Sequence, residues 1–182
     1  MSSEEATLIQ QAKGGDPAAF AEIYDRCQPA IYRYVYYQVN DAATAEDLTS
    51  EVFVRLVEKI DHFAYRGRPL LAWLYTIARN LITDHRRRAR YGTPIELEKQ
   101  PIPDATDVES TVEHTLAQHR LINAIGGLTD DQRQVILLKF IEGVDNATAA
   151  HVLGKSINAV KALQHRALAS LRRILEQNGQ AQ

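Results

Sequence analysis

Residues 70–90, LLAWLYTIARNLITDHRRRAR, decide how the first half of the chain folds. Apolar side chains recur there at steps of three and four positions: Leu70, Leu74, Ile77, Ala78, Leu81 and Ile82. This spacing predicts an amphipathic helix with one buried face. At about 100° per residue, four further side chains fall along one edge of that face: Trp73, Asn80, Asp84 and Arg87.

This edge of the helix has two interpretations. An aligned indole, amide, carboxylate and guanidinium could recognise a polyanion that carries flat bases. Alternatively, the tryptophan is buried beside a solvated flank, and the arginines that end the segment stabilise the helix C-terminus. The segment alone favours the second interpretation, because charge runs are usually solvated faces. Its surroundings in the sequence change that balance.

The composition is that of a globular protein that needs no disulfide. The 182 residues are 45% hydrophobic and allow one domain or two small ones. The lone Cys27 excludes an internal disulfide and a cysteine-rich zinc site, which favours a reducing cytosol. No apolar run reaches the length of a membrane span, and the N-terminus lacks a signal pattern. We therefore expect a cytoplasmic protein without a membrane partner.

Charge is segregated along the chain, although the formal net charge is only −2. Residues 66–90 carry seven arginines and one acid, Asp84. Residues 92–118 carry six acids and the single Lys99, and residues 155–173 are basic again. This basic–acidic–basic order is compatible with a nucleic-acid partner, against which the average charge would argue.

The N-terminal part predicts a helix that begins at Asp16-Pro17, a capping residue followed by proline at the first helical position. Its apolar stripe comprises Phe20, Ile23, Tyr24, Cys27, Ile31, Tyr34 and Val35. Pro29 predicts an interruption and a kink. Cys27 lies in the stripe, so we interpret it as part of the core and not as a nucleophile.

A second helix is predicted over residues 43–60. Its inner side comprises Leu48, Val52, Leu56 and Ile60, and its opposite side comprises Asp47, Ser50, Glu51, Val54 and Glu58. Val54 is an apolar residue on a polar and acidic face. It is either an incidental exposed valine, which is common, or the centre of a docking surface.

Residues 62–69, HFAYRGRP, are predicted to form a loop, since Gly67 and Pro69 punctuate them. Aromatic and basic side chains alternate in this loop: Phe63, Tyr65, Arg66 and Arg68. Such a composition suits stacking on single-stranded nucleic acid and neutralising its phosphates. Alternatively, the two aromatic rings pack back into the core.

Periodicity disappears between residues 91 and 108, where prolines and acids predict a linker. Helical patterning resumes over residues 109–125, and Thr129-Asp-Asp-Gln132 is a capping box. The helix that this box starts is apolar nearly all round, so we expect it at the centre of a second domain. No useful strand-like alternation occurs, which makes the fold class all-α.

The segment GVDNATAAHVLGKSINAVKALQHRALASLRRIL predicts a short helix, a turn at Gly154 and a longer helix capped by Ser156, which is a helix-turn-helix. Inward positions are Ile157, Val160, Ala167, Leu168, Leu171 and Leu175. Outward positions are Asn158, Ala159, Ala162, His165, Arg166 and Arg173. Small side chains permit close approach to a groove, and amide, imidazole and guanidinium groups contact bases and phosphates. This favours DNA recognition over an ordinary amphipathic hairpin.

Five segments together resemble a bacterial sigma factor of the sigma-70 family, in its extracytoplasmic-function (ECF, group IV) subfamily. Three match the family's second region: GDPAAFAEIYDRCQPAIYRY, DAATAEDLTSEVFVRLVEKI and AWLYTIARNLITDHRRR. Two match its fourth region: LTDDQRQVILLKFIEGV and AAHVLGKSINAVKALQHRALASLRR. The resemblance implies two helical domains, region 2 over residues 1–90 and region 4 over residues 109–178, joined by the acidic linker 91–108 with no third domain between.

In region 2 the resemblance implies two binding surfaces. One docks on the clamp helices of the largest RNA polymerase subunit and comprises Asp47, Ser50, Glu51, Val54, Arg55 and Glu58. The other captures a flipped base and the melted strand of the minus-ten element, and comprises Phe63, Tyr65, Arg66, Arg68, Trp73, Asn80, Asp84, Arg87 and Arg88. Ser50 departs from the glutamine that is most common in the family.

In region 4 the resemblance implies a reader of the minus-thirty-five element that comprises Ser156, Asn158, Ala159, Lys161, Ala162, His165, Arg166 and Arg173. This region also contacts the polymerase flap. At Leu163, where the family has a basic residue, we expect a lost phosphate contact, and helical phase directs Gln164 towards the packed side. The linker resembles a segment that threads the polymerase channels. An anti-sigma factor is a further expected partner, and the free chain is expected to be a monomer.

The expected function is therefore that of a non-catalytic specificity subunit without a cofactor. The alternative is a stand-alone helix-turn-helix regulator with an N-terminal sensing domain, which would bind closed duplex without polymerase. An enzyme would have to use Asp84-His85, whose side chains diverge on a helix, or Cys27. The histidines lack metal-ligand spacing: His114 and His119, for example, do not share a helix face.

Overall fold

A computed structural model of the chain describes residues 3–64, 68–91 and 112–180. All the elements in these residues are helical, which confirms the all-α fold class. The chain divides into two compact units, one of Met1–Val39 with Ala43–Leu97, the other of Glu98–Gln182 with Asn40–Ala42. The boundary after Leu97 falls within the predicted linker, whose structure lies outside the described residues, and the domain limits 1–90 and 109–178 stay predictions.

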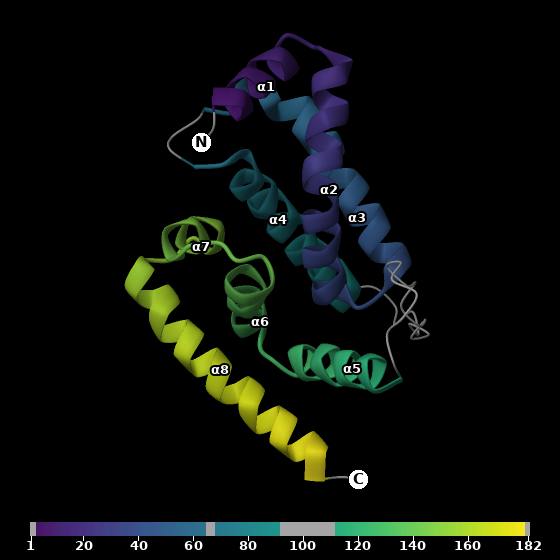
Figure 1. The fold of residues 1–182 in the computed structure, drawn as a ribbon, viewed down its shortest axis with the longest axis vertical. Coiled ribbons are helices and arrows are strands. Elements are labelled where there is room, and N and C mark those ends of the chain that lie inside the picture. The colour runs from purple at the N-terminus through teal and green to yellow at the C-terminus, as the bar shows by residue number, and fades with distance from the viewer. Residues whose placement is uncertain (1–2, 65–67, 92–111, 181–182) are drawn as a thin grey trace. The chain divides into compact units, whose positions relative to one another are not determined.

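The first unit is a helical bundle (Figure 1). Its elements are α1 (Ser3–Lys13), α2 (Pro17–Val39), α3 (Ala42–Lys59), the 3₁₀ turn η1 (Ile60–His62) and α4 (Leu70–Tyr91). Helix α2 packs against α1 on one side and α4 on another. The core between them is fully buried and includes Ile23, Ile31, Tyr34, Leu74, Tyr75 and Ile82. No described helix has the length and apolarity that crossing a bilayer requires.

Helix α1, which the sequence did not predict, forms hydrogen bonds with both ends of the segment between η1 and α4. The Lys13 Nζ donates to the Phe63 carbonyl oxygen at 2.6 Å. At the other end the Leu70 backbone N–H donates to Glu5 Oε1 at 2.9 Å. The second bond satisfies one of the amides that the start of a helix leaves without an intrahelical partner.

The predicted start of α2 is confirmed, and the predicted interruption is wrong. The Ala18 N–H donates to Asp16 Oδ1 at 2.9 Å, and α2 begins at Pro17. The helix runs on through Pro29 to Val39. Pro29 has no N–H to donate to the Asp25 carbonyl four residues earlier, and both residues are exposed. Tyr24, predicted within the apolar stripe, is exposed.

The second unit packs four helices and a π-helical turn around one core. Its elements are α5 (Val112–Gly126), α6 (Asp130–Ile136), the π turn η2 (Leu137–Ile141), α7 (Asn146–Leu153) and α8 (Ile157–Gln180). Helices α5, α6 and α7 all contact α8. The capping box of Thr129 and Gln132 is present as predicted. The guanidinium of Arg133 donates to the carbonyls of Ile125, Gly126 and Leu128 and so closes the end of α5.

The predicted helix-turn-helix is confirmed in its local geometry. Helix α7 ends at Leu153 and is followed by Gly154, whose φ of +63° is the left-handed conformation that favours glycine. Helix α8 follows, and Ser156 Oγ accepts from the Ala159 N–H at 3.1 Å. Asp145, which the sequence analysis overlooked, caps α7 by accepting from the Thr148 N–H at 2.6 Å.

Four apolar positions of this unit differ from their prediction. Phe140, expected inside a helix buried all round, is 50% exposed on the π turn. Ile157, Leu168 and Leu175, expected to pack inward, are also exposed. Helix α8 has 24 residues whereas its partners have 15, 7 and 8, so the flanks of its apolar stripe stay partly uncovered.

We expect Asp145→Ala to lower the free energy of unfolding by about 1 kcal/mol through loss of the α7 cap. The hydrogen bond from Thr148 lowers the pKa of Asp145. The contribution of the cap is therefore complete above the ordinary carboxyl pKa and is lost as pH falls through the lowered value. Urea unfolding followed by circular dichroism measures the change. Asp145→Asn, which keeps a side-chain acceptor, is the control and should retain most of the stability.

Candidate functional site

The α3 face is defined here as Asp47, Ser50, Glu51, Val54, Arg55 and Glu58. Helix α3 exposes this side because its other side is buried through Ala45, Thr49, Val52, Phe53 and Leu56. Val54 is 48% exposed. Arg55 bridges two carboxylates, with Nη2 2.8 Å from Glu51 Oε1 and Nη1 3.3 Å from Glu58 Oε2. The face thus combines an accessible valine with a pre-arranged charge cluster.

The structure adds an apolar residue that the sequence analysis did not select. Val57 is 56% exposed and lies three positions after Val54, so both valines lie on one side of α3. Whether Val57 is exposed depends on how α3 packs against the other helices of the unit. The spacing of the inner residues of α3 did not predict this packing. Two neighbouring exposed valines favour a docking surface over incidental exposure more strongly than a single exposed valine does.

The α4 edge is defined here as Trp73, Asn80, Asp84, Arg87 and Arg88, with Arg68 just before the helix. Asn80, Arg87, Arg88 and Arg68 are exposed, whereas Trp73 and Asp84 are half-buried. Arg87 Nη2 lies 3.0 Å from Asp84 Oδ1. Tyr65 and Arg66, predicted in the same site, lie outside the described residues. The α4 edge is therefore a polar and cationic surface beside a partly covered indole.

Phe63 corrects the prediction of an accessible stacking residue. Its side chain is only 9% exposed, and its ring centroid lies 5.1 Å from that of Trp73. The alternative, that a loop aromatic packs back into the core, holds for Phe63. It supports the indole and has no free face to offer a base.

We expect Phe63→Ala to lower the free energy of unfolding by about 3 kcal/mol, because a large ring leaves a cavity against Trp73. Trp73 is the only tryptophan of the chain, so its fluorescence reports on this neighbourhood directly. Phe140→Ala removes an exposed ring and should change stability little. Equal stability of wild type and Phe63→Ala would contradict the packing role.

The arginine run at the end of α4 divides into different roles. Arg86 Nη2 donates to the carbonyl oxygen and to Oε1 of Gln38, at 2.7 and 2.8 Å, and so ties α4 to α2. Arg87 is paired with Asp84, and Arg88 is exposed without an ion pair among the described residues. Sequence spacing could not separate Arg86 from its neighbours, because its partner lies 48 positions away.

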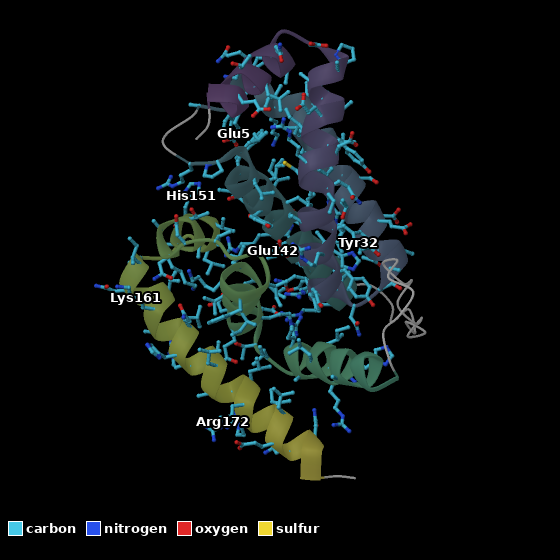
Figure 2. The ribbon with its side chains drawn as sticks, in the orientation of Figure 1. Glu5, Tyr32, Glu142, His151, Lys161 and Arg172 are labelled. Atoms are coloured by element: carbon cyan, nitrogen blue, oxygen red, sulfur yellow. The ribbon has the colours of Figure 1, made fainter. Side chains whose placement is uncertain are left out.

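The α8 face is defined here as Ser156, Asn158, Ala159, Lys161, Ala162, His165, Arg166 and Arg173. All eight are exposed, as predicted for the outward side, while Val160, Leu163 and Ala167 are buried beneath them. Leu163 therefore belongs to the core, and the loss of a phosphate contact at that position stays a prediction. Gln164 is half-buried. Figure 2 labels Lys161 and Arg172 on this helix.

The structure offers little for chemistry at the other candidates. Burial and, to a smaller extent, the Glu5 carboxylate raise the pKa of the Cys27 thiol to about 11, although Arg26 opposes them. A thiol with so high a pKa is a poor nucleophile at neutral pH. In the part of the chain that the structure describes, no three His, Cys, Asp or Glu side chains come together as metal ligands.

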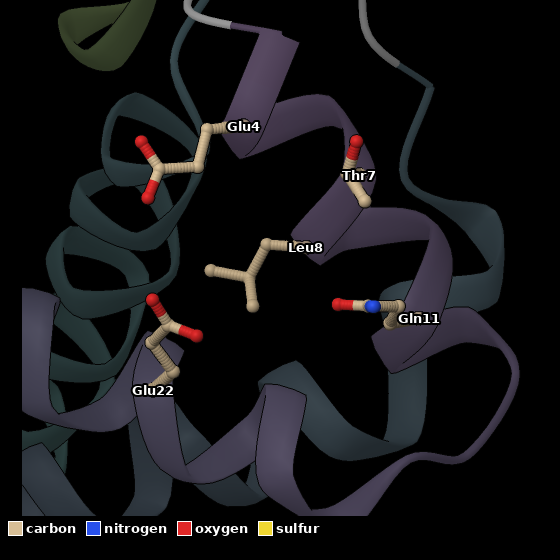
Figure 3. A pocket seen from close by; sticks show the side chains of 5 residues that line it. All are labelled: Glu4, Thr7, Leu8, Gln11 and Glu22. Atoms are coloured by element: carbon tan, nitrogen blue, oxygen red, sulfur yellow. The ribbon is translucent and has the colours of Figure 1, made fainter.

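A pocket of about 440 Å³ lies between α1 and α2 and is lined by Glu4, Thr7, Leu8, Gln11 and Glu22. Figure 3 shows Glu4 and Glu22 on the same side of Leu8. Arg26 already pairs with both carboxylates, with Glu4 at 2.8 Å. The pocket is thus a charge-compensated junction of two helices.

Comparisons with known proteins agree with this geometry. The family model of "Sigma-70 region 2" matches residues 23–91, and that of "Sigma-70, region 4" matches residues 118–171. The chain is 40% identical over 172 residues to the ECF RNA polymerase sigma factor BldN of Streptomyces coelicolor, covering 92% of this chain and 64% of that relative's length. It is 30% identical over 177 residues to the ECF RNA polymerase sigma factor SigW of Bacillus subtilis, covering 92% and 94% respectively.

A solved structure gives the same result. A co-crystal structure of the sigma factor RpoE in complex with the anti-sigma factor NepR, from Bartonella quintana, matches with a TM-score of 0.71 and 27% identity, over 86% of this chain and 96% of that chain. The chain therefore belongs to the sigma-70 family, among its ECF sigma factors. Sigma factors are non-enzymatic transcription initiation factors, which confirms the expectation of a non-catalytic protein.

Proposed function

We propose that the chain binds core RNA polymerase through the α3 face and directs it to promoters through the α4 edge and the α8 face. The observation that carries this proposal is the presence of three separately exposed surfaces on a chain that matches both sigma regions. A stand-alone regulator is disfavoured, because residues 23–91 match a sigma region and not a sensing domain. Since core polymerase is a cytoplasmic enzyme, cytoplasmic localisation belongs to the same proposal.

The proposed docking mode uses the two valines as the apolar centre and the Arg55 cluster as the polar rim. Apolar centres with polar rims are the common anatomy of protein interfaces. An anti-sigma factor would regulate the chain by covering such surfaces. The complex of the similar RpoE with NepR supports this second partner.

The proposed melting surface holds an extruded base and its strand on the α4 edge. The buried Phe63 packs against Trp73, with the ring centroids 5.1 Å apart. The exposed amide of Asn80 and the guanidinium groups of Arg87, Arg88 and Arg68 face the solvent, where a displaced strand can reach them. The energy of holding one base, about 1–3 kcal/mol, is comparable with that of unstacking it.

We expect Asn80→Ala with Arg87→Ala to leave closed-complex formation nearly intact and to reduce strand opening by about tenfold or more. Permanganate footprinting of duplex templates measures opening, and a pre-melted template should restore transcription. His85→Gln, on the opposite side of α4 from Asn80, is the control. Unchanged opening in the double variant would remove the α4 edge from the melting step.

A further inference from the structure

Neither of the two residues just before α4 can cap the helix with its side chain. Pro69 carries no hydrogen-bond acceptor on its ring, and the guanidinium of Arg68 carries only donors. An amide at the start of a helix ordinarily bonds to a serine, threonine, aspartate or asparagine side chain just before it. Here the Leu70 N–H donates to Glu5 Oε1 of α1, which lies 65 positions earlier, at 2.9 Å. The start of α4 therefore depends on α1.

The residue that ends η1 is bonded to the same helix. Lys13 Nζ donates to the Phe63 carbonyl oxygen at 2.6 Å. Lys13 and Glu5 are separated by about 12 Å along the axis of α1 and by about 80° around it, so both side chains leave α1 on one side. Each bond has a charged partner, and such bonds are stronger than neutral ones. Figure 2 labels Glu5 on α1.

Helix α1 is itself fixed to the bundle. Its apolar side chains are buried and at most 6% exposed: Leu8, Ile9 and Ala12. Glu4 Oε1 lies 2.8 Å from Arg26 Nη2 of α2, and α1 contacts both α2 and η1. The two bonds therefore connect the segment between η1 and α4 to a packed helix, which can hold both ends of that segment in place.

Both bonds converge on one pair of aromatic rings. Phe63 is buried, and its ring centroid lies 5.1 Å from that of Trp73. Trp73 is half-buried and lies three positions after Leu70, in the first turn of α4. Helix α1 thus holds the backbone of Phe63 and the start of the helix that carries Trp73. The indole of the α4 edge is placed before a DNA strand arrives.

We infer that Glu5 and Lys13 are positioning residues for strand opening, which act through Trp73 and do not touch DNA. The inference rests on the proposed function, which assigns the captured base to the α4 edge. A surface that is ordered in the free protein loses none of its binding free energy to ordering when the ligand arrives. Without the two bonds, the start of α4 and its indole must be ordered as the base arrives. Opening then slows, although closed-complex formation does not.

Glu5→Ala in the polymerase complex should slow strand opening roughly fivefold, because one hydrogen bond to a charged group is lost. Lys13→Ala should slow it similarly from the other end of the segment. Affinity for core polymerase and closed-complex formation should stay as in wild type, and a pre-melted template should restore transcription. Time-resolved permanganate footprinting of duplex templates measures the opening rate.

Glu4→Ala is the matched control. It removes the same charge from the same helix, together with the ion pair to Arg26, but no bond to the segment before α4. This variant should open DNA like wild type. Glu5→Gln keeps an oxygen acceptor and Lys13→Arg keeps a charged donor, so both should recover most of the lost rate.

A double-variant cycle distinguishes positioning from a general loss of stability. In a Trp73→Ala background, Glu5→Ala should slow opening no further, because the side chain that Glu5 positions is gone. A weakened fold would slow opening by the same factor in both backgrounds. In the free protein, the Leu70 amide should exchange with solvent faster in Glu5→Ala than in Glu4→Ala, since only the first variant removes its acceptor.

The outcomes separate the positioning role from the proposed function. Wild-type opening in Glu5→Ala and Lys13→Ala overturns the positioning role if Asn80→Ala with Arg87→Ala slows opening. Equal slowing by Glu4→Ala, or an equal loss with and without the indole, assigns the two bonds to the stability of the fold and overturns it as well. If the variant of Asn80 and Arg87 also opens DNA normally, the α4 edge is not the melting surface, and the positioning role fails with it.

Discussion

Val54→Asp should weaken binding of core RNA polymerase by about 2 kcal/mol or more, which is roughly 30-fold in Kd. The reason is that a new carboxylate at the centre of the α3 face must lose its water when the polymerase docks. The fold should survive, since the side chain is 48% exposed. Affinity of the full chain for core, together with the circular dichroism spectrum, measures both statements.

Two variants control this experiment. Lys59→Glu changes the net charge more than Val54→Asp does. Because Lys59 lies outside the α3 face, the Lys59→Glu protein should bind core polymerase normally. Glu51→Arg is a second way to damage the face, because it replaces a partner of Arg55 with a like charge. If core is retained equally by Val54→Asp, Glu51→Arg and wild type, the α3 face is not the docking surface.

Asn158→Ala or His165→Ala should reduce discrimination between promoter sequences by about 1–3 kcal/mol for each lost base contact. Both side chains are exposed on the α8 face, beside small alanines that permit close approach to the groove. Arg166→Ala or Arg173→Ala should instead weaken binding to all sequences and reduce the salt slope by about one. Affinities of the polymerase complex for duplexes mutated in the upstream element, at several salt concentrations, distinguish the two patterns.

Arg172→Ala is the matched control for the arginine variants. Arg172 lies on the same helix and is exposed, but its Nε is held 2.8 Å from Glu176 Oε1. Its removal should therefore alter affinity less than removal of Arg166. The four variants of Asn158, His165, Arg166 and Arg173 could each lose the same affinity for every duplex. That result would mean that α8 contacts the DNA backbone and recognises no bases.

Local rules in the sequence predicted the parts of the fold that depend on neighbouring residues. The start of α2 at Asp16-Pro17, the Thr129 capping box, the Gly154 turn and the Ser156 cap all rest on contacts within four residues. The spacing of apolar residues predicted α3, α4 and α8, and this spacing is also a pattern of neighbouring residues. Helix α1 was not predicted because it has few apolar residues. These residues, Leu8, Ile9 and Ala12, are buried through contact with other helices.

The candidate site was predictable in its exposed residues and not in its packing. Outward positions on α3 and α8 follow from helical phase, and the structure finds them exposed except Glu51, which is half-buried. The burial of Phe63 against Trp73 depends on how the loop meets α4, which no spacing encodes. The exposure of Leu168 and Leu175 depends on the lengths of the helices that cover α8, and the separate role of Arg86 depends on Gln38. These are properties of tertiary contacts.

The two bonds from α1 to the flanks of the loop have a consequence for genetics. Glu5 and Lys13 hold the Leu70 N–H and the Phe63 carbonyl, so α1 works as a strap across the segment that leads into the α4 edge. A substitution of Glu5 or Lys13 should remove one of these bonds and so loosen the attachment of Leu70 or Phe63 to α1. A screen that scores only transcription would class Glu5 and Lys13 with the promoter contacts, although neither belongs to the α4 edge. Fluorescence of Trp73 would distinguish variants of Glu5 and Lys13 from variants of the promoter contacts.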